Sequence, residues 1–172
     1  MSKSNAPSLR QLDEILFDVA TIIELNDTDR KAAESRYRKL KEVLSKSGSV
    51  FAPLLEHEDA KIYAQGSMAS STTIVSGTDD DRFDVDAIVE VQVPADWSPK
   101  EALDNLHESL KDFPHAKGVE RCTRCVQIKF ANMHMDVTVL DNKNRKSGER
   151  PGEIAHSPDE GESYMVPSNP YG

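Results

Sequence analysis

Two aspartates, Asp84 and Asp86, lie in a stretch whose other positions are mostly apolar. From Phe83 to Val93 every odd position is apolar, which is the alternation of a strand with one buried face. The two carboxylates then share the opposite face, with their Cα atoms roughly 6.6 Å apart. Like charges this close repel each other and favour a bound cation, and carboxylate oxygens suit Mg²⁺. The pair predicts a divalent-metal site for chemistry on a nucleoside triphosphate.

A Gly-Ser step precedes this pair of acids. Residues 61–64 have the pattern of a short strand, Gly66 and Ser67 follow it, and residues 68–73 could begin a helix. A helix start directed at a ligand offers backbone N–H groups to an anion, and the Ser67 hydroxyl adds a donor. Gly66 and Ser67 are therefore candidates for holding a triphosphate.

A third carboxylate, Asp136, comes from a second alternating region. Residues 126–130 are apolar at even positions and residues 133–139 at odd positions. The switch of the apolar residues from even to odd positions across residues 131–132 predicts a tight hairpin or a bulge there. Asp136 and His134 are then expected to face away from the apolar side. Three acids on adjacent strands could hold one or two Mg²⁺ ions for an in-line phosphoryl displacement. An acid not fully engaged by metal could take the proton of an attacking hydroxyl.

Helical periodicity predicts the elements that position these acids. Amphipathic helices are expected from about Ser8 to Leu25 and from about Asp29 to a C-terminal Gly48, with a short helix after Pro53. Residues 98–101 fit a capping box that opens a third long helix. Its buried stripe is formed by Leu103, Leu106 and Leu110, and it ends before Pro114. Beyond Leu140, the composition predicts a loop-rich tail with little to bury.

Bulk composition sets further bounds. The 172 residues suit one domain with a core, and 30% charged against 37% hydrophobic residues indicates a globular protein. No membrane span or secretion signal is evident. The net charge of −9 argues against stable nucleic-acid binding. With Cys122 and Cys125 as its two cysteines, the chain is expected in a reducing cytoplasm.

Two other stretches resemble metal-binding motifs but lack ligands that those motifs need. The stretch from Asp79 to Glu90 superficially resembles an EF-hand loop, but Phe83 and Asp84 occupy the positions that need a ligand and a glycine. Cys122-Thr123-Arg124-Cys125 has zinc-knuckle spacing, yet a structural zinc needs two more ligands and the histidines form no pair at motif spacing. Free thiols are the favoured interpretation.

The segments QGS, FDVDAIVEV, MHMDVTVL and SNP resemble the DNA polymerase β-like nucleotidyltransferase superfamily. Within it they look most like the bacterial cyclic-oligonucleotide synthases of antiphage defence. The resemblance implies an α/β (α+β) fold, with a mixed, mainly antiparallel sheet, flanking helices and the metal site at one sheet edge. It also implies that Asp84, Asp86 and Asp136 are catalytic metal ligands for Mg²⁺ or Mn²⁺, with Asp136 helping to activate the acceptor hydroxyl. Gly66 and Ser67 match the family's triphosphate-binding turn.

The same resemblance implies a function. Nucleoside triphosphates such as ATP or GTP would be joined, with release of pyrophosphate, into a cyclic di- or trinucleotide second messenger for a separate effector. A regulatory protein partner is compatible with this function. Two rivals remain open: transfer of AMP to a protein, as in some toxin–antitoxin pairs, and a catalytically silent nucleotide-binding module.

The sequence departs from the family pattern in two places. Residues 68–83 form a longer spacer between Ser67 and Asp84 than the common form of the motif has. The family's C-terminal helical domain is also expected to lie outside residues 1–172. Residues 1–172 are therefore expected to be a catalytic core, with scaffold helices over 8–48, the sheet with its metal site over 61–140, and the tail over 141–172.

Overall fold

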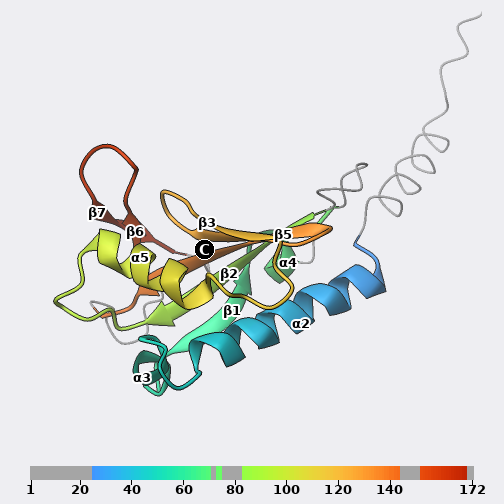
Figure 1. Cartoon of the computed structure of the whole chain (residues 1–172), viewed down its shortest axis with the longest axis horizontal. Helices are drawn as coiled ribbons and strands as arrows, with labels where there is room; N and C mark the ends of the chain where they lie inside the picture. Colours follow the sequence, from blue (N-terminus) through green and yellow to red (C-terminus); the bar gives the residue numbers. More distant parts are fainter. Residues whose placement is uncertain (1–24, 71–72, 75–82, 144–151, 170–172) are drawn as a thin grey trace, which may run out of the picture.

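The structure is a computed structural model that describes residues 25–70, 73–74, 83–143 and 152–169 (Figure 1). Its strands form one sheet in the order β1-β2-β5-β4-β3, and β6 pairs with both β5 and β7. Strands β2 and β5 are parallel, while the other described pairings are antiparallel. The expected mixed, mainly antiparallel sheet is thus confirmed.

The described elements, in chain order, are α2 (Asp27–Leu44), α3 (Ala52–Leu55), β1 (Lys61–Gln65), α4 (Gly66–Ser70), β2 (Phe83–Val91), α5 (Pro99–Leu110), β3 (Gly118–Arg121), β4 (Val126–Lys129), β5 (Met133–Asp141), β6 (Gly152–His156) and β7 (Tyr164–Ser168). The helix expected from Ser8 lies, apart from Leu25, outside the described residues. Among the described residues, no helix is long and apolar enough to cross a membrane.

Helix α2 begins at a well-formed cap and ends earlier than predicted. The Asn26 side chain accepts hydrogen bonds from the backbone N–H groups of Thr28 and Asp29, each at 2.9 Å. At the other end the helix stops at Leu44, not beside Gly48, because the chain turns as the Lys46 N–H donates to Val43 O at 3.3 Å. Gly48, with φ of +94°, belongs to the turn that follows.

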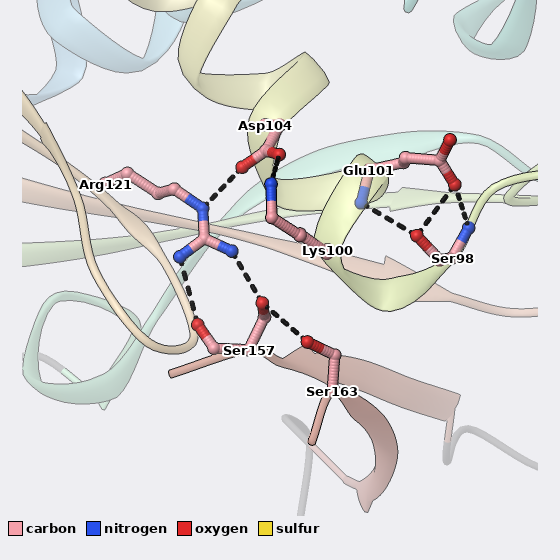
Figure 2. Close-up of polar contacts among 7 residues, drawn as sticks. All are labelled: Ser98, Lys100, Glu101, Asp104, Arg121, Ser157 and Ser163. Carbon is pink, nitrogen blue, oxygen red and sulfur yellow. Dashed lines mark hydrogen bonds and ion pairs between the residues drawn. The ribbon is translucent and has the colours of Figure 1, made fainter. Parts of the chain in front are cut away.

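Helix α5 begins with the predicted capping box. The Ser98 hydroxyl accepts from the Glu101 N–H at 3.2 Å, and the Glu101 carboxylate accepts from the Ser98 N–H at 2.7 Å (Figure 2). The predicted leucine stripe is fully buried. It packs in one core with the buried face of α2 and the odd-numbered side chains of β2.

Strand β2 is buried more completely than its alternation predicted. The odd-numbered side chains from Phe83 to Val91 are buried, as expected, but Ile88 and Glu90 on the other face are buried as well. The Asn142 side-chain amide donates to the Glu90 carboxylate at 3.1 Å. The even face of β2 is therefore accessible only where Asp84 and Asp86 lie.

The prediction of a loop-rich tail with little to bury is wrong for residues 152–168. Strand β6 pairs with the end of β5, where Leu140 and Ile154 are register partners, and β7 completes a hairpin. Both strands are short and lack a clear two-residue alternation. In β7, Pro167 has no backbone N–H to donate to a neighbouring strand. Pairing with a distant strand end, rather than local pattern, orders this part of the chain.

Arg121 holds the β6–β7 hairpin against α5 and β3 (Figure 2). Its Nε donates to Asp104 of α5 at 2.6 Å, and its Nη1 and Nη2 donate to the carbonyl and hydroxyl of Ser157 at 3.0 and 2.7 Å. The Ser163 hydroxyl donates to Ser157 Oγ at 2.8 Å, while the Ser157 N–H donates to Thr123 O at 2.8 Å. One guanidinium thus joins three elements that are far apart in the sequence.

Replacing Arg121 with Met should lower the free energy of unfolding by about 1–3 kcal/mol, because three donors to partly buried acceptors are lost. A urea titration would measure this loss. The matched control is Lys39→Met, which removes an ion pair to Glu42 whose side chains are 41% and 64% exposed and should change little. Equal effects of the two substitutions would contradict the role given to Arg121.

The same contact should make stability depend on pH. Burial alone would raise the pKa of Asp104, but hydrogen bonds from Lys100 and Arg121 outweigh it and hold the pKa below its ordinary value of 3.8. Ionised Asp104 therefore stabilises the fold above about pH 4, and this contribution is lost as the pH falls through the folded-state pKa. The decrease in the free energy of unfolding caused by Arg121→Met should be largest near neutral pH and smaller below about pH 4. Urea titrations at both pH values would measure this difference.

Candidate metal and nucleotide site

The parallel pairing of β2 with β5 brings the three predicted acids together. Asp86 and Asp136 are direct register partners on neighbouring strands, which lie about 4.8 Å apart. Asp84 lies one pleat away on the same face, opposite His134. The acids lie on inner strands of the sheet, flanked by β1 and β4, so the expectation of a site on a sheet edge is wrong.

The electrostatics of this group favour a cation. Burial raises the pKa of Asp86, and the neighbouring charges of Asp136 and then Asp84 raise it further. An ionised Asp86 is therefore costly unless positive charge is brought to it. A divalent ion bound by carboxylate oxygens would supply that charge.

Asp84 is the most exposed of the three acids. It is 82% exposed, and its Oδ1 lies 3.7 Å from His134 Nδ1. Among the described residues, no three His, Cys, Asp or Glu side chains converge closely enough to hold a metal ion as they stand. The backbone register and the oxygen donor set fit Mg²⁺, and metal binding would require the exposed Asp84 side chain to rotate away from His134.

Gly66 makes room for the Asp86 carboxylate. Its φ of +63° is in the left-handed region, and a Cβ at this position would lie 2.4 Å from Asp86 Oδ2. A side chain here would collide with the Asp86 carboxylate. The predicted Gly-Ser turn is thus directly beside one of the predicted metal ligands.

Ser67 continues this turn into α4. Its hydroxyl accepts a hydrogen bond from the buried Thr73 hydroxyl at 3.0 Å. Accepting this bond fixes the oxygen and leaves the Ser67 proton as a donor. The Ser70 hydroxyl donates to Gly66 O at 3.1 Å and to Ser67 O at 3.3 Å, which ties down the backbone of the turn.

Three contacts around the acids were not predicted from the sequence. Tyr37 of α2 donates its hydroxyl to Asp86 O at 2.9 Å, and Gln127 of β4 donates from Nε2 to Asp136 Oδ1 at 3.0 Å. The Cys125 thiol also hydrogen-bonds Asp136. The alternation of β4 could have placed Gln127 on the acid face, whereas Tyr37 looks like an ordinary member of a helix stripe.

The surroundings of these groups change their ionisation. Burial, followed by the charge of Asp86, raises the pKa of Tyr37, so this phenol stays protonated and remains a donor. Burial, followed by the charge of Asp136, raises the pKa of Cys125, so this free thiol also stays protonated. Both groups are therefore donors beside the acids rather than additional anions.

Comparisons with known proteins identify the family of this chain. The model of the Second Messenger Oligonucleotide or Dinucleotide Synthetase (SMODS) domain matches residues 11–151. The cyclic dinucleotide synthase CdnG of Bradyrhizobium diazoefficiens is 36% identical over 167 residues, which span 90% of this chain and 38% of that protein. The chain thus spans well under half of the curated relative that it matches.

Solved structures of cyclic dinucleotide synthases have a similar fold. The CD-NTase CdnG of Bradyrhizobium diazoefficiens in complex with GTP has a TM-score of 0.79 at 34% identity, with 96% of this chain and 45% of that chain covered. The GTP-bound form of DncV from Vibrio cholerae has a TM-score of 0.60 at 16% identity, with 88% and 55% covered, and shows the fold alone. The chain belongs to the SMODS domain family, the Second Messenger Oligonucleotide or Dinucleotide Synthetases.

Proposed function

We propose that residues 1–172 are the catalytic core of a Mg²⁺-dependent nucleotidyltransferase that makes a cyclic di- or trinucleotide second messenger from nucleoside triphosphates. The observation that carries the proposal is the register pairing of Asp86 with Asp136, with Asp84 one pleat away and Gly66 packed against Asp86. Membership of a synthetase family and the similarity to a GTP-bound relative support it.

The three acids would hold the metal, and the Gly-Ser turn would hold the triphosphate. Asp84, Asp86 and Asp136 would hold Mg²⁺ (Mn²⁺ can take its place), which supplies charge neutralisation to the phosphates when bound. The Ser67 hydroxyl and the backbone of Gly66 would bind the triphosphate. Asp136 would accept the proton of the attacking ribose hydroxyl. The hydroxyl oxygen then bonds to the α-phosphorus as the bond to pyrophosphate breaks, and repetition closes the ring.

The biological setting rests on the family resemblance. GTP is the substrate that a comparison supports, since a relative at 34% identity is described in complex with it. ATP is proposed as a further substrate on the family resemblance alone. The product would act on a separate effector in the cytoplasm during antiphage signalling. A protein partner could switch the activity on.

Incubation of the chain with Mg²⁺ and α-labelled GTP and ATP tests the proposal. A phosphatase-resistant labelled product on thin-layer chromatography is expected from wild type and not from Asp84→Asn/Asp86→Asn. A labelled protein band instead of a small product would favour transfer of AMP to protein. Failure of the wild type to bind Mg²⁺–nucleotide or to turn it over would contradict the proposal.

A further inference from the structure

We infer that Gln127 is a positioning residue that orients the Asp136 carboxylate for metal binding and proton transfer. The inference rests on the proposed function, because it assigns a role toward the same site. Gln127 is an uncharged residue of β4. It acts on the site through its hydrogen bond to Asp136.

The sheet places Gln127 directly beside Asp136, on the side away from Asp86. Gln127 and Asp136 are register partners in the β4–β5 pair, while Asp86 is the partner of Asp136 on β2. Gln127 Nε2 lies 3.0 Å from Asp136 Oδ1. The neighbours of Gln127 in β4, Val126 and Ile128, are fully buried, so the strand that carries the amide is fixed in the core.

The hydrogen bond from Gln127 opposes the effect of repulsion between the acids. Asp86 and Asp136 repel each other, and without a partner the Asp136 carboxylate would rotate to increase its distance from Asp86. An ionised carboxylate only accepts hydrogen bonds, so the amide N–H of Gln127 holds Oδ1 on the β4 side. The amide does not engage Oδ2, and the Cys125 thiol is a second hydrogen-bond partner of the same carboxylate. Partners of this kind orient metal ligands in other proteins.

Two variants that lack the side-chain amide of Gln127 test the inference. Gln127→Met keeps the unbranched shape of the side chain, and Gln127→Val favours a strand, so it keeps the test valid if the Met variant folds poorly. Thr138→Val is the matched control, because it removes a polar group from the same face of β5 and leaves the Gln127–Asp136 bond in place. Circular dichroism and the melting temperature without metal would verify folding for each variant.

The readout is Mn²⁺ binding, followed by electron paramagnetic resonance with and without a non-hydrolysable GTP analogue. Both Gln127 variants should need at least about tenfold more Mn²⁺ for half-saturation, while Thr138→Val should stay within about twofold of wild type. In turnover assays, excess Mn²⁺ should recover more of kcat in the Gln127 variants than in Asp136→Asn. Neither result follows from a merely structural role.

The outcomes separate this inference from the proposed function. If wild type binds Mn²⁺ and Asp136→Asn does not, while the Gln127 variants bind like wild type, Gln127 has no positioning role and the proposed site stands. If wild type binds Mn²⁺ no better than Asp84→Asn/Asp86→Asn, the proposed metal site is wrong. The positioning role of Gln127 is then wrong as well, because it depends on that site.

Discussion

Asp86→Asn should reduce nucleotidyl transfer by at least about a hundredfold, which corresponds to roughly 2.7 kcal/mol of transition-state stabilisation. Asn keeps the shape of the side chain but removes the charge through which Asp86 would hold Mg²⁺. Formation of the labelled product from GTP and ATP would measure this effect. Asp96→Asn, in the exposed turn after β2, is the matched control and should keep full activity.

The same substitution should raise the melting temperature in the absence of metal. Burial and the nearby Asp136 and Asp84 raise the pKa of Asp86, so its ionised form costs stability near neutral pH. A neutral Asn removes that cost, and a gain in stability with a loss of activity is typical of a site strained for function. Mg²⁺ with nucleotide should then stabilise wild type and leave the variant unchanged. A variant that is less stable and still active would contradict both arguments.

Gly66→Ala should abolish activity nearly as completely as loss of Asp86. The added Cβ would lie 2.4 Å from Asp86 Oδ2, so either the carboxylate or the turn must move. The φ of +63° adds a backbone cost of about 1–2 kcal/mol for any residue with a Cβ. Product formation and a urea titration would measure the two effects separately.

Gly48→Ala is the matched control for that experiment. Gly48 also has a positive φ, +94°, but a Cβ there would meet nothing within 4 Å. Both substitutions should lower stability, and only Gly66→Ala should lose metal–nucleotide binding. If the two variants lose activity equally, backbone strain rather than crowding of Asp86 is responsible, and the close approach of Gly66 to Asp86 has no functional meaning.

Local chemistry accounts for the features that could be predicted from the sequence. The capping box at Ser98 and the turn between β4 and β5 depend on residues a few positions apart. The placement of Asp136 on the polar face of β5 follows from a two-residue alternation and is confirmed by the burial of its neighbours. These signals were sufficient to find the acids and the strands that carry them.

Long-range pairing accounts for what could not be predicted. The alternation of β2 does not reveal that Ile88 and Glu90 are covered on the second face, since that depends on which elements lie against it. Strand β6 exists because the end of β5 offers it a partner. The Tyr37 bond to the backbone of Asp86 joins residues 49 positions apart, and no local pattern encodes it.

Diffraction from crystals of the chain grown with Mn²⁺ and a non-hydrolysable GTP analogue, recorded for the anomalous signal of manganese, is the most direct test. We expect a manganese peak ligated by Asp84, Asp86 and Asp136, with Asp84 turned away from His134 and the triphosphate against Gly66 and Ser67. A nucleotide bound elsewhere, or a manganese ion that excludes Asp136 from its ligands, would contradict it.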